Sequence, residues 1–348
     1  MIMETLKGLT TGIGSLPYKD ADEALELIFK YCPQIPFWPQ LPKRDIREGM
    51  INQYSENLPC LRMSREGVFF SGENKEKELE QFYEKFINRD SDHFKLSKDY
   101  ALGLYAFYER LAKADLENVQ YLKCQITGPF TFAASIKDEK GMALLHDEVF
   151  MQMIIKALAM KALWQIRFFE GFKKKLIMFI DEPYLGCFGS AYTPINREDV
   201  VKGLSELIQE VRDPQVLWGL HCCGNTDWSI FTDIKEINII SFDAFGFLDK
   251  VVLYADKLAD FLKRGGILCW GIVPTQDFSG KETPDFLLER LKQGINSLVK
   301  KGLDQDLLWN SLILSPACGL GTLDVKSSEQ IFKLLSELSY NILPPARF

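Results

Sequence analysis

The sequence has no excess of positive charge and no segment typical of a membrane protein. Its 348 residues include 41 Lys and Arg against 48 Asp and Glu, which gives a formal net charge of −7. Proteins that wrap nucleic acid or coat anionic membranes need a basic face, so neither partner is expected here. No apolar run approaches the roughly 20 residues that cross a bilayer, and we predict no membrane-spanning helix.

The start of the chain also lacks a basic stretch followed by an apolar one, so we predict no signal peptide. The expected location is the cytoplasm, where thiols stay reduced. Eight cysteines are scattered along the chain rather than spaced as in a small disulfide-rich scaffold. Most are expected to be small buried residues, and the question is which of them have another role.

The chain contains no internal repeat, low-complexity tract or Gly/Ser linker, but short apolar runs alternate with helical patterns. Helical spacing of apolar residues is clear over 197–212 and 284–300. Alternating strands and helices are typical of a parallel sheet. The expected strands are residues 9–14, 36–39, 121–126, 176–180, 216–220, 237–242, 267–271 and 311–315. They predict an α/β protein with one (β/α)₈ TIM barrel over residues 1–348.

Residues 41–120 are too many for a single crossover between two strands. We interpret this stretch as an insertion after strand two, or an elaborated crossover, with a hairpin near 61–70 and helices near 74–88 and 97–114. A doubly wound open sheet is the alternative architecture. It is less favoured because no G-x-G-x-x-G motif follows the first strand.

A candidate metal site lies at the ends of the fifth and eighth expected strands. Successive side chains of a strand point to opposite faces, so His221 and Cys223 share one side while Cys222 faces away. Cys318 follows strand eight at the same rim of the barrel. Three soft ligands with one exchangeable position are typical of catalytic Zn²⁺. A buried histidine beside two core cysteines would give the same pattern.

Three acids also follow strands directly. Asp181 and Glu182 lie where burial is expected, and an unpaired buried carboxylate is costly. Either acid could hold a substrate cation or a proton, or could form a salt bridge or a helix cap. Asp243 could be a fourth, displaceable zinc ligand, could accept a hydrogen bond from His221, or could cap its strand.

Three further residues are candidates for substrate binding. Ser15 and Thr127 stand in glycine-containing turns whose backbone N–H groups could meet an anion. Such turns are also common for steric reasons alone. Trp270 could line a pocket, although a tryptophan in an apolar strand is more often part of the core.

Taken together, these motifs resemble the catalytic barrel of cobalamin-independent methionine synthase and its relatives. That superfamily includes uroporphyrinogen decarboxylase and the methylcobalamin:thiol methyltransferases. The similarity follows the chain in order at residues 13–17, 125–129, 180–183, 221–224, 243 and 315–319.

The resemblance implies that His221, Cys223 and Cys318 hold Zn²⁺ and that Asp243 completes the metal's ligands. It also implies roles in binding homocysteine, with Asp181 at the amino group and Ser15 at the carboxylate. The implied activity is methylation of a zinc-bound thiol, as in methionine biosynthesis.

The sequence departs from the folate-dependent enzyme in three ways. It has one expected barrel rather than two, and residues 272–277 after strand seven contain no histidine to protonate a departing folate. The family's second homocysteine-binding glutamate has no secure equivalent. A methylcorrinoid donor needs no such protonation, so we expect one, presented by a partner protein, rather than methyltetrahydrofolate.

Two other functions remain open from the sequence. A uroporphyrinogen decarboxylase-like enzyme would use arginines such as Arg44 and Arg47 to bind an anionic substrate. A non-catalytic module that carries zinc or docks a corrinoid protein is the second alternative.

Overall fold

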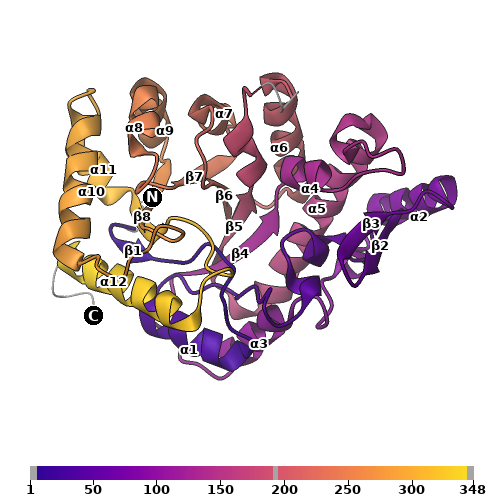
Figure 1. Cartoon of the computed structure of the whole chain (residues 1–348), viewed down its shortest axis with the longest axis horizontal. Coiled ribbons are helices and arrows are strands. Elements are labelled where there is room, and N and C mark those ends of the chain that lie inside the picture. Colours follow the sequence, from indigo (N-terminus) through magenta and orange to yellow (C-terminus); the bar gives the residue numbers. More distant parts are fainter. Residues whose placement is uncertain (1–5, 191–194, 343–348) are drawn as a thin grey trace.

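The computed structural model describes residues 6–190 and 195–342. Seven parallel strands form one curled sheet in the order β1-β9-β8-β7-β6-β5-β4 (Figure 1). In chain order the strands are β1 (Leu9–Thr10), β4 (Tyr121–Thr127), β5 (Lys175–Asp181), β6 (Val216–Cys222), β7 (Ile237–Phe242), β8 (Ile267–Val273) and β9 (Leu312–Pro316). The sheet is therefore open between β1 and β4, the position expected for strand two.

The strand predicted at 36–39 is not formed, and the first strand is shorter than expected. Residues near Phe37 instead make isolated parallel bridges, one from Phe37 to Lys123 of β4 and one from Gln40 to Ser15. Pro36 and Pro39 have no N–H group to donate, so a regular hydrogen-bond ladder cannot run through this segment. The segment spans the gap without becoming an eighth strand.

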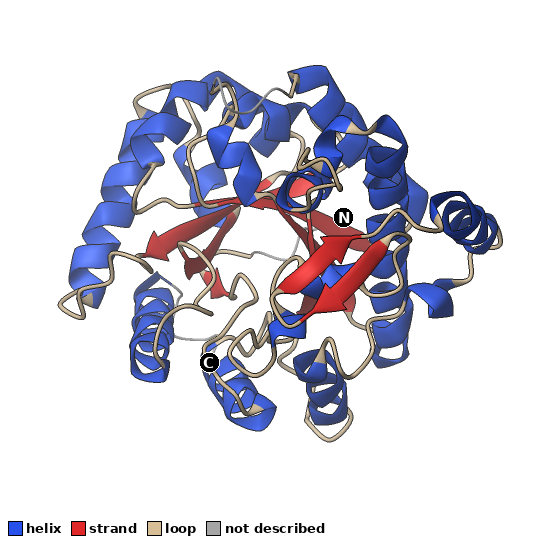
Figure 2. Cartoon of the chain, turned by 45° about the vertical axis from the view of Figure 1, so that its right-hand side comes forward, coloured by secondary structure: helices blue, strands red, loops and turns tan. Residues whose placement is uncertain are grey.

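Helices cover the outer face of the sheet (Figure 2). The longer ones are α1 (Ala21–Tyr31), α3 (Leu102–Leu111), α5 (Glu148–Phe169), α6 (Arg197–Val211), α9 (Ala255–Lys263), α10 (Pro284–Val299) and α12 (Val325–Ile342). Short helices are α4 (Pro129–Ser135), α7 (Trp228–Asp233), α8 (Leu248–Val251) and α11 (Gln305–Asn310). The helices predicted at 197–212 and 284–300 are confirmed, the latter with Thr283 as its N-cap.

The stretch from 41 to 120 contains the expected hairpin, β2 (Leu61–Ser64) with β3 (Gly67–Phe70), followed by α2 (Lys75–Ile87) and α3. The hairpin and α2 project at one side of the molecule (Figure 1). Asn52 anchors the hairpin, since its side chain accepts from the Val68 N–H and donates to the Ile46 carbonyl. That this stretch is an insertion stays a prediction.

The interior of the curled sheet changes from apolar to polar along the strands. An apolar cluster inside it includes Ile177, Phe179, Ile239 and Ile313, and is separate from the larger core between sheet and helices. Gly219 leaves room for the Phe179 ring, because a Cβ there would lie 2.3 Å from it. The next inward positions toward the carboxyl ends are polar, and they form the candidate site.

Helix α5 is the one described helix long and apolar enough to cross a membrane by length and composition. Within the segment Glu148–Phe172, 78% of the apolar 18-residue window is buried inside the protein. Its inner face packs on β4 and its other faces contact α4 and α6, as expected of a core helix.

Candidate metal centre

The strand register places five polar side chains in one row across the interior. Thr127 pairs with Asp181, Asp181 with His221, His221 with Ser241, and Ser241 with Cys269. All five point inward because they share the alternation of the apolar cluster one layer below. From Thr127 to Ser241 the row lies at the carboxyl ends of the strands, where barrel enzymes carry their chemistry.

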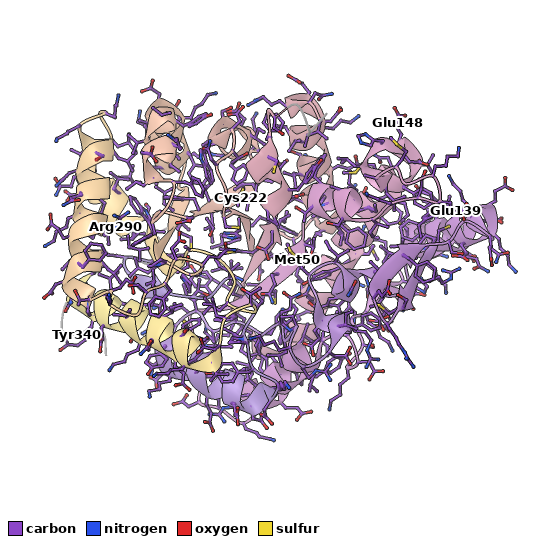
Figure 3. All side chains as sticks on the ribbon, viewed as in Figure 1. Met50, Glu139, Glu148, Cys222, Arg290 and Tyr340 are labelled. Carbon is purple, nitrogen blue, oxygen red and sulfur yellow. The ribbon has the colours of Figure 1, made fainter. Side chains whose placement is uncertain are left out.

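His221, Cys223 and Cys318 come together at this end of the sheet. One potential ligand atom from each residue lies within 4.8 Å of the other two. Cys222, marked in Figure 3, is fully buried in the outer core and donates to the Gly224 carbonyl. The alternation of β6 thus brings Cys223, and not Cys222, to the side of His221.

The imidazole of His221 is held from one side only. Its Nδ1 atom lies 2.9 Å from the Ser241 hydroxyl, while its Nε2 atom is buried and has no hydrogen-bond partner. Buried polar atoms are nearly always paired in folded proteins. An unpaired ring nitrogen facing two cysteines is the arrangement that a metal ion would complete.

The two cysteines interact electrostatically. A hydrogen bond with Cys318 is the largest influence on Cys223 and lowers the pKa of its thiol, with a further contribution from His221 against the opposing effect of burial. The same contact raises the pKa of Cys318. The pair therefore favours one thiolate next to one thiol, an electron-rich environment suited to a soft cation.

The spacing fits a zinc ion. Zn²⁺ binds sulfur at about 2.3 Å and nitrogen at about 2.1 Å, which separates tetrahedral ligand atoms by roughly 3.5–3.8 Å. Ligand atoms within 4.8 Å of one another need only small side-chain movements to reach that geometry. The donor set of one imidazole and two thiolates favours zinc over magnesium or calcium.

Asp181 lies beside this group with an unsatisfied oxygen. Its Oδ1 atom is buried and has no hydrogen-bond partner. Burial raises the pKa of Asp181 to about 6, while His221 and Lys123 act to lower it. The carboxylate is therefore largely ionised above pH 7 and can receive the ammonium group of a substrate.

Asp243 does not belong to the group of three close ligand atoms among the described residues. Its carboxylate accepts a hydrogen bond of 2.7 Å from the Gly246 N–H, in the turn after β7. Burial raises the pKa of Asp243, and Cys223 and His221 are near enough to affect it. A role as fourth ligand stays a prediction that would require the side chain to leave this turn.

The carboxylate of Glu182 caps helix α4. Its carboxylate accepts from the N–H groups of Phe130 and Thr131 and from the Thr131 hydroxyl, at the N-terminus of α4. Burial raises the pKa of Glu182 to about 7 against the lowering effect of these donors. The helix cap, one of the four roles open from the sequence for this acid, is observed, and a role in substrate binding stays a prediction.

The remaining predicted substrate-binding residues have structural partners. The Thr127 hydroxyl donates to the carbonyl of Met50, marked in Figure 3. The Ser15 hydroxyl accepts from the Gly321 N–H at 3.3 Å, which places it against the loop that follows Cys318. Trp270 faces the outer core, where it contacts Phe242 and is 1% exposed. Because the Trp270 side chain points outward, it does not belong to the inward row of polar side chains.

Three inward residues escaped sequence reasoning. Ser241 contacts His221, and Lys123 is fully buried with its amine donating to the Ile13 carbonyl and to Gln125. A signal existed for each of them. Lys123 and Gln125 alternate with apolar residues in β4, and Ser241 stands two residues before Asp243 on the same face.

Comparison with known proteins finds likenesses among solved structures. No protein-family model matches the chain, and no curated protein matches it. Among solved structures, the chain is similar to a B12-independent methionine synthase from Shewanella sp. W3-18-1 in complex with selenomethionine, with a TM-score of 0.43 and 17% identity. The match covers 64% of this chain and 62% of that one, so the chain spans less than two thirds of that protein's length.

Proposed function

We propose that this protein is a zinc-dependent methyltransferase that activates a thiol, with homocysteine favoured, and methylates it from a methylcorrinoid donor. The observation that carries the proposal is the cluster of His221, Cys223 and Cys318, with their ligand atoms within 4.8 Å of one another. Its position at the strand ends beside Asp181 agrees with the site implied by the resemblance to methionine synthases.

The three residues would hold Zn²⁺ and leave one position for the substrate. When bound, the metal would lower the pKa of a coordinating thiol and so supply a thiolate nucleophile at neutral pH. Asp181 orients an amino-acid thiol, because its unpaired oxygen can accept from the substrate ammonium group. A thiol that carries a sulfonate instead of an amine would bring no cation to this carboxylate.

The choice of donor rests on the positions of the histidines. Apart from His221, the sequence contains only His93 and His146, which lie in the turns Ser91–Phe94 and Leu144–His146 outside the curled sheet. Neither can protonate a leaving group above the candidate metal centre. A methylcorrinoid leaves without such protonation, so the arrangement favours it over methyltetrahydrofolate.

The proposal is tested by zinc content and turnover in the same preparations. We expect about one zinc per wild-type chain and loss of most of it in Cys318→Ser. Cys187→Ser is the matched control, because Cys187 is an exposed free cysteine. Demethylation of methylcobalamin, followed by its absorbance, is expected with homocysteine and not with coenzyme M. Metal-free wild-type protein after purification with added zinc would rule the proposal out.

Two observations bear on the alternatives. Arg44 pairs with Glu48, and Arg47 pairs with Asp45 and Asp99, so neither guanidinium is free for a porphyrinogen carboxylate. A decarboxylase would also leave the metal group without use. A non-catalytic zinc module would bind the metal but show no homocysteine-dependent turnover, so the same assay separates it from the enzyme.

A further inference from the structure

We infer that Ser241 is a positioning residue that selects Nε2 of His221 as the metal ligand by holding the ring proton on Nδ1. This inference rests on the zinc site proposed above and assigns a role to a residue outside the ligand set. It follows from the hydrogen bond that the structure gives to Nδ1 of His221.

The contact is built into the sheet. His221 of β6 and Ser241 of β7 are register partners, so neighbouring backbones hold their Cα atoms at a fixed separation. His221 is 2% exposed and Ser241 is fully buried, and 2.9 Å separates Nδ1 from the hydroxyl oxygen. Water cannot easily replace the serine at such a position, and the ring has few other orientations available.

The hydrogen bond to Ser241 determines which nitrogen of the imidazole can bind a metal. A neutral histidine carries one N–H group and one lone pair, so a metal bound at one nitrogen requires the proton on the other. The Ser241 oxygen can accept the Nδ1 proton, which leaves the Nε2 lone pair directed at the space near Cys223 and Cys318. Ligating histidines almost always have such an acceptor behind them, although a carboxylate or a carbonyl is more usual.

The serine hydroxyl retains a proton of its own to donate. Cys269 is the next residue in the row, and its thiol neighbours the hydroxyls of Ser315 and Ser241. A continuous path therefore runs from Nδ1 through the Ser241 hydroxyl to the Cys269 sulfur. With both its accepting and donating sides engaged, Ser241 has little freedom to reverse its role and donate to Nδ1.

The experiment compares metal coordination in full-length wild-type protein, Ser241→Ala and Ser241→Thr. The matched control is Ser315→Ala, because Ser315 is also buried inside the sheet and its hydroxyl also neighbours the Cys269 thiol, whereas the contact with His221 is made by Ser241. Zinc affinity is measured by competition with a chelator. In parallel, ¹⁵N-labelled protein is loaded with ¹¹³Cd, and spin coupling identifies the histidine nitrogen bound to the metal.

In wild-type protein we expect coupling between cadmium and Nε2, with the proton on Nδ1. Ser241→Ala is expected to bind zinc about 10–100-fold more weakly, the usual effect of losing a histidine's outer partner. Ser241→Thr, which keeps the hydroxyl, should restore most of the affinity, and Ser315→Ala should match wild type.

The outcomes separate the two proposals. Coupling through Nδ1 in wild-type protein overturns the role of Ser241, whatever becomes of the variants. Unchanged affinity in Ser241→Ala overturns it as well, while the zinc site itself stands. A wild-type chain that binds neither metal overturns both the site and the positioning role.

Discussion

Replacing Glu182 by glutamine tests whether this acid belongs to the fold or to the chemistry. The carboxylate accepts three hydrogen bonds at the start of α4, from two backbone N–H groups and the Thr131 hydroxyl. Glutamine keeps the length of the side chain but replaces one accepting oxygen with an NH₂ group that can only donate. At least one buried donor of α4 is then left without a partner.

The expected loss of stability follows from the number of donors that lose their partner. An unsatisfied buried donor costs about 1–3 kcal/mol, and hydrogen bonds to a charged group lie at the upper end of this range. We therefore expect Glu182→Gln to lower the free energy of unfolding by about 2–3 kcal/mol at pH 8, where this carboxylate is mostly ionised. Zinc content and homocysteine-dependent turnover should stay near wild type at temperatures where the variant remains folded. The Glu182 side chain bonds to Phe130 and Thr131, and the hydrogen bond from Glu182 to the His221 carbonyl is made by the backbone N–H, which the substitution keeps.

Urea denaturation followed by tryptophan fluorescence measures the change. Glu148→Gln is a suitable control, because this exposed acid in the first turn of α5 is not the capping residue, which is Asp147. The control should change stability by less than about 0.5 kcal/mol. A Glu182→Gln protein with wild-type stability but little turnover would refute the reasoning and return Glu182 to the active site.

Two further predictions concern buried charges. Lys161 is fully buried and donates to the Glu56 carbonyl, and burial lowers its pKa from 10.5 to about 8. Between pH 8 and 10.5 the folded state therefore binds fewer protons than the unfolded chain. The buried charge of this lysine lowers the free energy of unfolding by about 3 kcal/mol at pH 7, and this cost decreases as the pH rises from 8 to 10.5. Lys161→Met loses the bond to Glu56 but removes this cost, so its free energy of unfolding should exceed that of wild type by about 1–2 kcal/mol at pH 7. Urea titrations should show that this difference disappears by pH 10.5. A variant that is less stable than wild type at pH 7 would contradict the prediction. Asp181→Asn should raise the KM for homocysteine about 10–100-fold, because a charge-assisted hydrogen bond is lost, and unchanged KM would exclude contact with the substrate.

The arrangement of the candidate metal ligands could be predicted from the sequence because it depends on local geometry. A regular strand alternates its side chains, so His221 and Cys223 had to share a face and Cys222 had to oppose it. The position of Cys318 needed only the rule that parallel strands end at a common edge. The structure confirms both expectations, with Cys222 in the outer core and Cys318 near its partners.

The prediction of a strand at 36–39 was wrong for a reason that is also local, although the apolar pattern of this segment is typical of a strand. Phe37 and Trp38 are fully buried, as in a strand, but prolines at 36 and 39 remove two of the donors that a ladder requires. The direction of Trp270 was predictable from alternation, since its neighbour Cys269 points inward. A place in the core was therefore a better expectation for Trp270 than a place in the wall of a pocket.

The partners of Glu182 could not be predicted from the sequence, because they belong to another part of the chain. Asp181 and Glu182 are adjacent acids, and composition does not distinguish them. Their roles separate only when α4, some 50 residues earlier, places its free N–H groups against the end of β5. One acid then has three donors, while an oxygen of the other has none.

This contrast indicates where a ligand would bind. Among the described residues, nine buried side-chain atoms have no hydrogen-bond partner, and two of them are Asp181 Oδ1 and His221 Nε2. These atoms belong to register partners on adjacent strands, so they lie on the same inner face at the same height. A buried acceptor costs about 1–3 kcal/mol when unsatisfied, and a fold keeps two such atoms side by side when a ligand pairs them. A zinc ion at His221 Nε2 and an ammonium group at Asp181 Oδ1 would satisfy both atoms at once. An amino-acid thiol carries this ammonium group together with the sulfur that would bind the zinc ion.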